Sequence, residues 1–472
     1  MKTGLTFSDV LLIPKKTTLN SRAEADTKTQ FTKNIFLNCP LVSSNMATVT
    51  EHKMAIAMAR EGGLGIIHQF NTIQEQVREV KRVKKSTTYV IENPVAVSPN
   101  ATVKGAVELM KEEEVTSLIV KSEGEVVGIF TRRDYLFEED WERRVFEVMT
   151  PKEKLIIAPH NVSVEEAKRI LHRNRIEKLP LFEDGKLKGL ITTQDLVKMD
   201  YWSRATRDKM GQLLVGAAVG TKDTLERAKA LVDAGADVIV LDVAHSHSEF
   251  IIEKLKELKS QIKIDIMVGN IATKEAAKEL IEAGADGLKV GIGPSPVCTT
   301  RIISGSGVPQ LTAIIDVCEV AKEYNVPVSA DGGMSSPGDA TKALAAGAST
   351  IYSGSFFAGT TEAPGMIIMK DGKRYKRYAG SASYDDNHLR KEKLSGEQIK
   401  EKLDIFVEGV VNLVNYKGVV EGIIKSLIKG IKSGISYCGA RNIKEMQENA
   451  EFIQITSAGW EESQSRGKRL FE

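Results

Sequence analysis

The feature that most constrains the fold is an alternation of short apolar runs with longer amphipathic stretches, beginning near residue 204. Each run is almost continuously apolar and ends in glycine or polar residues, which is typical of strands buried on both faces of a parallel sheet. The predicted strands are residues 213–220, 236–244, 263–270, 286–293, 327–333 and 350–359. Between them lie predicted helices such as 224–235 and 273–284, which stop at Gly235 and Gly284.

Two further strands are predicted before residue 70. They are residues 36–46 and 63–69, and a helix is predicted between them at 51–62. The total of eight strands is the number that closes a TIM barrel. We therefore expect an α/β fold built on a (β/α)8 barrel.

An internal repeat interrupts the alternation. Residues 97–136 are echoed by residues 157–197, so that Gly128 aligns with Gly189. Each copy predicts a capped helix, a strand, a glycine turn and a second strand. We expect the barrel to comprise residues 1–88 and 204–472. Residues 89–203 are expected to form an inserted tandem module, with halves at about 89–142 and 147–200.

Composition removes several classes of function. A formal net charge of +2 provides no global field for nucleic acid or an anionic membrane. No apolar run reaches the roughly 18 residues of a membrane helix, and the N-terminal run is too short for a signal peptide, so we expect a cytoplasmic protein without membrane partners. The four cysteines lack CxxC spacing, which argues against zinc and disulfides. Three of them, Cys39, Cys318 and Cys438, are expected to be buried hydrophobic residues.

Candidate site residues lie where the predicted strands end, because TIM-barrel active sites are built on the loops that follow the strands. These positions are Ser44, Asn45, Met46, Asp242, Asn270, the loop 291–301, Asp331, Gly332, Gly333, Ser353, Gly354 and Ser355. Any single glycine here is explained by a tight turn. Gly332, Gly333, Gly354 and Ser355 together, in the last two loops, predict a phosphate site. The carboxylate of Asp331 is suited to accept hydrogen bonds from a ribose diol.

Cys298 is the candidate nucleophile. An isolated cysteine is usually a buried hydrophobic residue, but this one lies in a loop rich in glycine and proline after a predicted strand. The loop is expected to expose the sulfur, and the nearby Arg301 and free backbone amides favour a thiolate.

Several motifs resemble the IMP dehydrogenase/GMP reductase family across nearly the whole barrel: VGNIAT, LKVGIGP followed by CTTR, GVPQLTAI, ADGG, GSFFAGTTEAPG and GISYCGA. The resemblance implies that Cys298 attacks C2 of a purine mononucleotide and that hydride passes between C2 and NAD or NADP. It also implies a covalent thioimidate, resolved by water or ammonia that Thr300 positions. Glu408 matches a Glu or Gln that helps to activate this nucleophile.

The resemblance further implies contacts for each ligand. Those to the nucleotide are Ser44, Met46, Ser295, Asp331, Gly332, Gly333, Gly354, Ser355, Tyr378, Gly380 and Ser381. Those on the nicotinamide side are Asp242, Asn270 and Arg301. A K⁺ ion is implied at the loop residues Gly293, Ser295 and Cys298.

The sequence departs from the family in this loop and in the flap. Ser295 and Pro296 stand where dehydrogenases have Gly and Ser. Pro296 has neither hydroxyl nor N–H, so one phosphate contact is lost, and a residue other than Gly weakens the expectation of K⁺. The family's flap carries an Arg-Tyr pair whose Arg is the base for hydrolysis. Only Arg390 stands near that place, without the Tyr, and a solvated charged loop is the alternative interpretation.

The inserted repeat resembles the paired cystathionine-β-synthase-type (Bateman) module. That resemblance implies an adenine or guanine nucleotide effector at Thr131, Asp134, Thr192 and Asp195. The alternative is that these Thr and Asp residues only cap helices.

The direction of the reaction stays open between two activities. The inserted module and the VPQLTAI and FAGTTEAPG motifs favour an IMP dehydrogenase, which is the first hypothesis. Asn45, Ala47 and the segment 335–344 are closer to the reductases, so a GMP reductase is the alternative. A nucleotide sensor without catalysis and a phosphate-binding barrel of unrelated chemistry are hypotheses from other classes. The resemblance also implies a homotetramer, which the inserted modules can pair into an octamer.

Overall fold

The computed structural model describes residues 1–86, 90–91, 94–113, 115–194, 196–197, 202–383 and 407–464. It divides into two compact units. The first comprises Met1–Ser86, Arg204–Asp208 and Leu213–Glu472, and the second comprises Thr87–Ser203 and Lys209–Gln212. The short segment 209–212 therefore groups with the insertion, whereas the sequence had placed it with the barrel.

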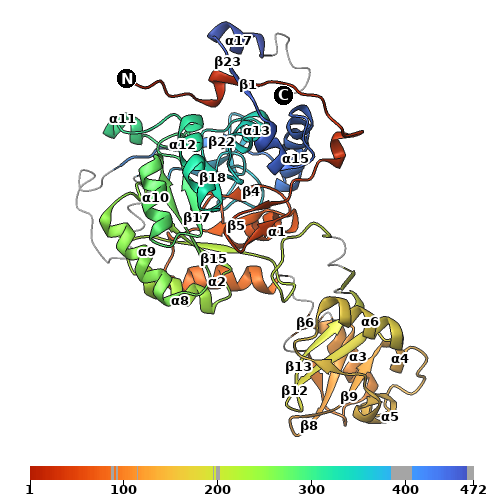
Figure 1. Cartoon of the computed structure of the whole chain (residues 1–472). Helices are drawn as coiled ribbons and strands as arrows, with labels where there is room; N and C mark the ends of the chain where they lie inside the picture. Colours follow the sequence, from red (N-terminus) through yellow and green to blue (C-terminus); the bar gives the residue numbers. More distant parts are fainter. Residues whose placement is uncertain are drawn as a thin grey trace. The chain divides into compact units, whose positions relative to one another are not determined.

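The first unit is a closed barrel of eight parallel strands (Figure 1). In barrel order the strands are β14 (Gly216–Val219), β15 (Val238–Asp242), β16 (Asp265–Ile271), β17 (Gly287–Val290), β18 (Val328–Asp331), β19 (Thr350–Ser353), β4 (Leu41–Ser43) and β5 (Leu64–Ile67). Each lies within a predicted strand, except that β16 continues one residue beyond its prediction, to Ile271, and the predicted barrel is confirmed. The chain enters at β4 and β5, and the insertion separates β5 from its neighbour β14.

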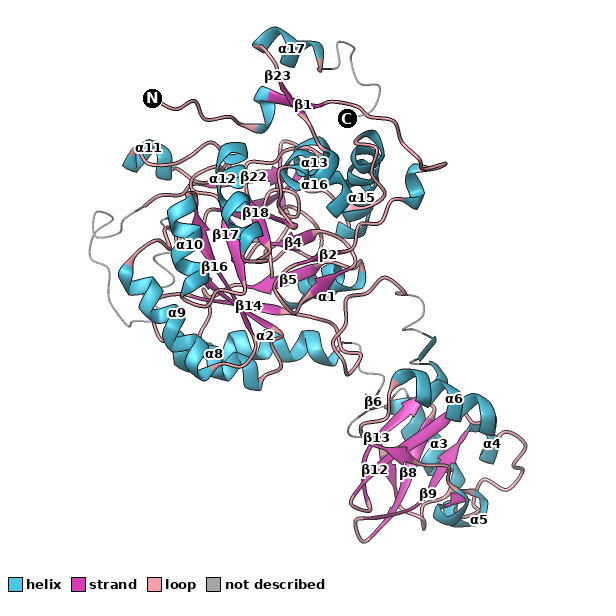
Figure 2. Ribbon diagram, viewed as in Figure 1, coloured by secondary structure: helices cyan, strands magenta, loops and turns pink. Residues whose placement is uncertain are grey.

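Helices surround the strands (Figure 2). They are α1 (His52–Arg60), α2 (Ile73–Lys85), α8 (Thr224–Asp233), α9 (Glu249–Gln261), α10 (Lys274–Glu282), α12 (Gln310–Glu323), α13 (Pro337–Ala345), α15 (Val420–Tyr437) and α16 (Ile443–Asn449). Two of them end as predicted, because Gly235 and Gly284 have φ angles of +97° and +105° that only glycine adopts readily. No helix in the described part of the chain is long and apolar enough to cross a membrane.

One end of the barrel is filled by side chains. Phe31, in the hairpin of β2 (Thr29–Gln30) and β3 (Phe36–Leu37), packs with Leu64 and Met267 in the barrel core. Asp265 at the start of β16 accepts hydrogen bonds from Thr32 Oγ1 and from the backbone N–H of Asn34, at 2.6 and 2.7 Å. These contacts close the end at which the strands begin, which leaves the opposite end for a site.

Besides the β2–β3 hairpin, two further small sheets accompany the barrel in the described part of the chain. One consists of β20 (Ile368–Lys370), β21 (Lys373–Ala379) and β22 (Val411–Asn415). The other pairs β1 (Val10–Leu12) with β23 (Phe452–Gln454) and so joins segments from the two ends of the sequence. The sequence analysis predicted neither sheet.

The second unit contains two four-stranded sheets that repeat one pattern. The first sheet has β7 (Ala96–Val97), β8 (Ser117–Ser122), β9 (Glu125–Thr131) and β10 (Thr150–Pro151); the second has β6 (Val90–Ile91), β11 (Ala158–Pro159), β12 (Lys178–Glu183) and β13 (Lys186–Thr192). The helices with described bounds in it are α3 (Val103–Glu112), α4 (Arg132–Tyr135), α5 (Val145–Val148) and α6 (Val164–Asn174).

The two halves agree in detail. The hairpins β8–β9 and β12–β13 turn at Glu123-Gly124 and Asp184-Gly185, all four residues having positive φ, as two-residue hairpin turns require. Both hairpins also shift register after an equivalent pair of residues, at Val120/Lys121 and Leu181/Phe182. The internal repeat in the sequence is therefore a structural repeat. Its assignment to the Bateman type stays a prediction.

Candidate functional site

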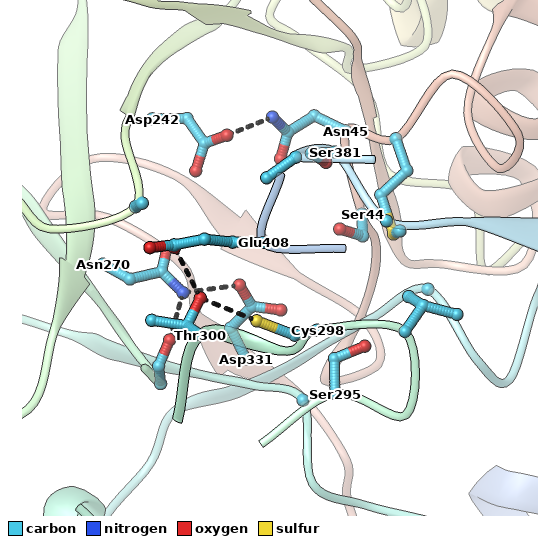
Figure 3. A pocket seen from close by; sticks show the side chains of 18 of the residues that line it. Ser44, Asn45, Asp242, Asn270, Ser295, Cys298, Thr300, Asp331, Ser381 and Glu408 are labelled. Carbon is cyan, nitrogen blue, oxygen red and sulfur yellow. Dashed lines mark hydrogen bonds between the residues drawn. The ribbon is translucent and has the colours of Figure 1, made fainter. Parts of the chain in front are cut away.

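A pocket of about 430 Å³ lies where the barrel strands end (Figure 3). The structure brings most of the predicted site residues into its wall. These are Ser44, Met46, Asp242, Asn270, Gly293, Ser295, Cys298, Thr300, Asp331, Gly332, Gly354, Ser355, Tyr378, Gly380, Ser381 and Glu408. Asn45 lines it as well, whereas the predicted residues Arg301, Gly333 and Ser353 do not.

Cys298 is half-buried and belongs to a chain of polar groups (Figure 3). Its Sγ lies 3.1 Å from Thr300 Oγ1, and Thr300 Oγ1 donates to Glu408 Oε2 at 2.8 Å. The hydroxyl has one proton, and Glu408 receives it, so the thiol is the donor in the remaining contact. The geometry therefore provides a proton path from Cys298 through Thr300 to a carboxylate.

Backbone hydrogen bonds hold this chain of groups in place. The N–H of Cys298 donates to the Ser295 carbonyl at 3.0 Å, and the N–H of Thr299 donates to the Glu408 carbonyl at 2.8 Å. Thr300 begins the short helix α11 (Thr300–Ser304). Glu408 comes from the segment before β22, far along the sequence, which is why spacing alone does not pair it with Cys298.

The phosphate-side residues form a tight wall. Gly332 and Gly333 have φ angles of +80° and +78°, and Gly333 shapes this turn from behind the pocket lining. A Cβ on Gly354 would lie 2.6 Å from Met46 Sδ and 2.8 Å from the Tyr378 hydroxyl, so only glycine fits there without displacing them. Burial raises the pKa of Tyr378 to about 12, although its hydrogen bond with Ser295 acts in the opposite sense. Tyr378 is therefore a neutral phenol beside Ser295.

A buried cation lies at the base of the pocket, and the sequence analysis missed it. Lys289 on β17 contacts Asp242 Oδ1 at 2.7 Å, Asp331 Oδ2 at 3.0 Å and Asn270 Oδ1. Burial alone would lower the pKa of Lys289, but the two carboxylates more than offset burial and hold it above its usual value. One signal was available: Lys289 is the only charged residue in the four-residue strand β17.

The neighbouring polar groups extend this network across the barrel. Asn45 donates from Nδ2 to Asp242 Oδ2 at 2.8 Å, and its Oδ1 accepts from the Tyr352 hydroxyl at 2.6 Å. Gln69, Phe70, Gly220 and Thr221 complete the same side of the pocket, and none of them was predicted. They follow β5 and β14. None of them is a charged residue or a strong nucleophile, so the sequence alone does not mark them as site residues.

The predicted cofactor contact Arg301 fastens its own loop. Its Nε donates to the Ile292 carbonyl at 2.9 Å, and its Nη2 donates to the Val308 carbonyl at 2.5 Å. The predicted K⁺ residues Gly293, Ser295 and Cys298 share this loop, and K⁺ there stays a prediction. Arg390, the predicted flap base, lies outside the described residues.

The predicted effector residues lie in the second unit. Thr131 directly precedes α4, and its backbone N–H and its hydroxyl donate to Asp134 Oδ2 at 2.6 and 2.9 Å. Both residues also line a cavity of about 510 Å³ that contains Arg132, Arg133, Lys154 and Lys178. Burial raises the pKa of Asp134. Thr192 is buried away from this cavity lining, and Asp195 lies outside the described residues.

Comparison with known proteins assigns the family. The model of the IMP dehydrogenase / GMP reductase domain matches residues 4–466. An inosine-5'-monophosphate dehydrogenase of Nitrosopumilus maritimus is 48% identical over 469 residues, covering 98% of each chain. A GMP reductase of Leishmania donovani is 43% identical and covers 98% of this chain and 96% of its own.

The solved structures agree with this assignment. A GMP reductase from Trypanosoma brucei in complex with guanosine 5'-monophosphate is 42% identical, with a TM-score of 0.86 and 99% coverage of both chains. The same enzyme in complex with guanosine 5'-triphosphate has a TM-score of 0.75 at 38% identity, covering 97% of this chain and 99% of its own. This chain belongs to the IMP dehydrogenase/GMP reductase family.

Proposed function

We propose that the chain is a purine-mononucleotide oxidoreductase that works through a covalent bond between Cys298 Sγ and C2 of the purine. The observation that carries the proposal is the continuous contact from Cys298 Sγ to Thr300 Oγ1 and from there to Glu408 Oε2. This arrangement couples a nucleophile to a proton acceptor inside one pocket. Relatives named for both directions of this chemistry cover the full barrel.

Each residue has a distinct task in this proposal. Glu408 draws the Thr300 proton toward itself, so that Thr300 can take the thiol proton as Cys298 attacks. Glu408 then releases this proton to solvent. When water resolves the covalent intermediate, the same pair orients the water and accepts its proton, while the bond from C2 to Cys298 Sγ breaks and the thiol is restored. Asp331 holds the ribose, while backbone N–H groups near Gly332 and Gly354 hold the phosphate.

The opposite half of the pocket fits a nicotinamide cofactor. Its wall is Asp242, Asn270 and the backbone of Gly291, where a Cβ would lie 2.1 Å from the Asp331 carbonyl oxygen. This wall offers carboxylate and amide groups as hydrogen-bond partners for the carboxamide of the ring. When bound, the nicotinamide exchanges the hydride with purine C2. We propose NAD as the first choice and NADP as the alternative, with K⁺ near Gly293 and Ser295.

The proposed direction is oxidation of inosine 5'-monophosphate to xanthosine 5'-monophosphate, with reduction of guanosine 5'-monophosphate to inosine 5'-monophosphate and ammonia as the second candidate. Inosine-5'-monophosphate dehydrogenases among the relatives reach 48% identity, against 43% for the Leishmania reductases. The reductase stays a candidate because Glu408 and Thr300 are equally suited to exchange a proton with ammonia and with water. A nucleotide sensor without catalysis is the candidate from another class.

Two absorbance assays test these candidates. The chain is incubated with inosine 5'-monophosphate and NAD⁺, and separately with guanosine 5'-monophosphate and NADPH, while the reduced nicotinamide is followed. We expect the first reaction to proceed and Cys298→Ala to abolish it without loss of nucleotide binding. Turnover only in the second assay would assign the reductase. Absence of turnover in both, with nucleotide binding retained, would favour the sensor.

The second unit and the assembly carry proposals of their own. We propose that the cavity beside Thr131 and Asp134 takes a purine nucleotide effector, since Arg132, Arg133, Lys154 and Lys178 supply positive charge for phosphates. The Trypanosoma enzyme in complex with guanosine 5'-triphosphate supports a guanine nucleotide. We further propose a cytoplasmic homotetramer that pairs into an octamer, which sedimentation velocity measures directly.

A further inference from the structure

Lys289 is almost completely enclosed at the base of the pocket. Its side chain is 3% exposed, compared with 16% for Asp242 and 19% for Asp331. Its Nζ also lies 5.1 Å from the centroid of the buried Tyr352 ring. An ammonium is costly to bury without partners, so its neighbours define what it does.

The cation fixes the orientation of an amide. Lys289 contacts Asn270 Oδ1, so the amide nitrogen must face the other way. There Nδ2 donates to Asp331 Oδ2 at 2.9 Å and to the Gly291 carbonyl at 2.6 Å. The cation at the oxygen and the two acceptors at the nitrogen together distinguish the two ends of the amide.

The same ammonium group also holds two carboxylates in position, those of Asp242 and Asp331. Asp242 is bound at both oxygens, by Lys289 and by Asn45. Asp331 is bound by Lys289 and Asn270 at Oδ2 alone, and within the described ranges its Oδ1 accepts no hydrogen bond. Asp331 is therefore anchored through one oxygen and presents the other to the pocket.

We infer that Lys289 is a positioning residue of the nucleotide site, which directs Asp331 Oδ1 at the ribose 2'-hydroxyl and sets Asp242 and Asn270 on the cofactor side. This inference rests on the proposed function. Both carboxylates touch one nitrogen, so they lie within about 6 Å, where like charges repel strongly. Removing the ammonium lets Asp331 turn away, and the ribose loses its acceptor.

The test compares a mononucleotide with its 2'-deoxy analogue by calorimetric titration without cofactor. The wild type is expected to prefer inosine 5'-monophosphate over 2'-deoxyinosine 5'-monophosphate by roughly tenfold or more, as for one hydrogen bond to a charged group. Lys289→Met should bring this ratio close to one, chiefly by weakening the ribonucleotide. In turnover assays, KM for the nucleotide should rise more than kcat falls.

The chain offers a matched control. Lys84 is another buried lysine between two carboxylates, Asp208 and Asp237, both at 2.8 Å, away from the pocket lining. Lys84→Met should lower stability and leave the ribose preference unchanged. If Lys289→Met does not fold, Lys289→Gln combined with Asp242→Asn preserves the net charge of the cluster and should still lose the preference.

The outcomes separate the two proposals. A wild type that binds neither mononucleotide contradicts the proposed function itself. A wild type with the preference, together with Lys289 variants that retain it, overturns only the positioning role. Equal weakening of both nucleotides in the variants would also overturn it, because that pattern reflects general damage to the pocket. Equal binding of both by the wild type would contradict a contact between Asp331 and the 2'-hydroxyl.

Discussion

Thr300 concentrates the chemistry of the site in one hydroxyl. It accepts from a thiol and donates to a carboxylate, and both partners are held by backbone hydrogen bonds that Thr300 does not make. A substitution at Thr300 can therefore remove the proton path while leaving Cys298 and Glu408 where they are.

Thr300→Val tests this path with almost no change in volume. We expect kcat to fall by about 10²-fold to 10⁴-fold, the usual contribution of general acid–base catalysis, with a smaller change in KM for the nucleotide. Thr300→Ser retains the hydroxyl and should retain most of the activity. Steady-state kinetics of the two variants provide the measurement, and equal losses in both would contradict a specific role of the hydroxyl.

Sequence reasoning was strongest for residues in loops and weakest for buried charge. Cys298, Asp331 and Gly354 were found because strand ends in a barrel share one mouth. Lys289 was missed, since a charged side chain inside a barrel strand contradicts the apolar pattern that identifies the strand. Arg301 lies close to the predicted nucleophile in sequence, but its guanidinium binds the carbonyls of Ile292 and Val308, and Arg301 itself does not line the pocket.

At the level of elements, the loop after β19 depends on a missing side chain. Gly354→Ala would place a methyl group against Met46 Sδ and the Tyr378 hydroxyl. Because Tyr378 is buried on β21, it cannot yield freely, and the wall of the pocket must move. We expect KM for the nucleotide to rise about tenfold or more, with a loss of stability of roughly 1–3 kcal/mol from overpacking. Gly422→Ala, where φ is likewise not positive and a Cβ would meet nothing within 4 Å, is the control for an added methyl group without a clash.

A second prediction at this scale concerns Asp237, which directly precedes β15 and pairs with Lys84 in the last turn of α2. Burial raises the pKa of Asp237 to about 6, and this outweighs the attraction of Lys84. The folded state thus binds a proton more tightly than the unfolded state, whose carboxyl has an ordinary pKa near 3.9. Between these values stability falls as pH rises, because ionisation is easier in the unfolded chain.

The measurement is the urea midpoint of wild type and Asp237→Asn at pH 5 and pH 7. On lowering the pH from 7 to 5, Asp237 should contribute about 1 kcal/mol of added stability to the wild type, and the Asn variant should lack this term. An identical pH response in both proteins would contradict the assignment. Asp208→Asn, at the other contact of Lys84, serves as the comparison.

The helices and strands of the barrel could be predicted because burial imposes a clear periodicity on them. The sheet of β20, β21 and β22 could not. Its strands carry exposed Lys, Arg and Asn among exposed apolar residues such as Met369 and Leu413, so no alternation marks a buried face. The pairing of β1 with β23 joins residues far apart in sequence, which no local pattern reveals.

At the scale of the whole molecule, the two compact units have separate hydrophobic cores. Replacing residues 87–203 with a short flexible linker should therefore leave the barrel folded, with kcat within a few-fold of the full chain. The variant should lose any response of the activity to purine nucleotides that bind the second unit. Activity is titrated with guanosine 5'-triphosphate in both proteins, and a response that survives the deletion would place the effector site on the barrel.

The closure of the barrel has a consequence for how the chain is made. β4 and β5 leave the ribosome early, yet their outer neighbours are β19 (Thr350–Ser353) and β14 (Gly216–Val219), which are synthesised much later. Until then these two apolar strands have only each other, and their free edges are open to other nascent chains. The inserted unit, complete in itself, can fold during this interval. Vectorial synthesis therefore leaves the free edges of β4 and β5 exposed until the later strands are made.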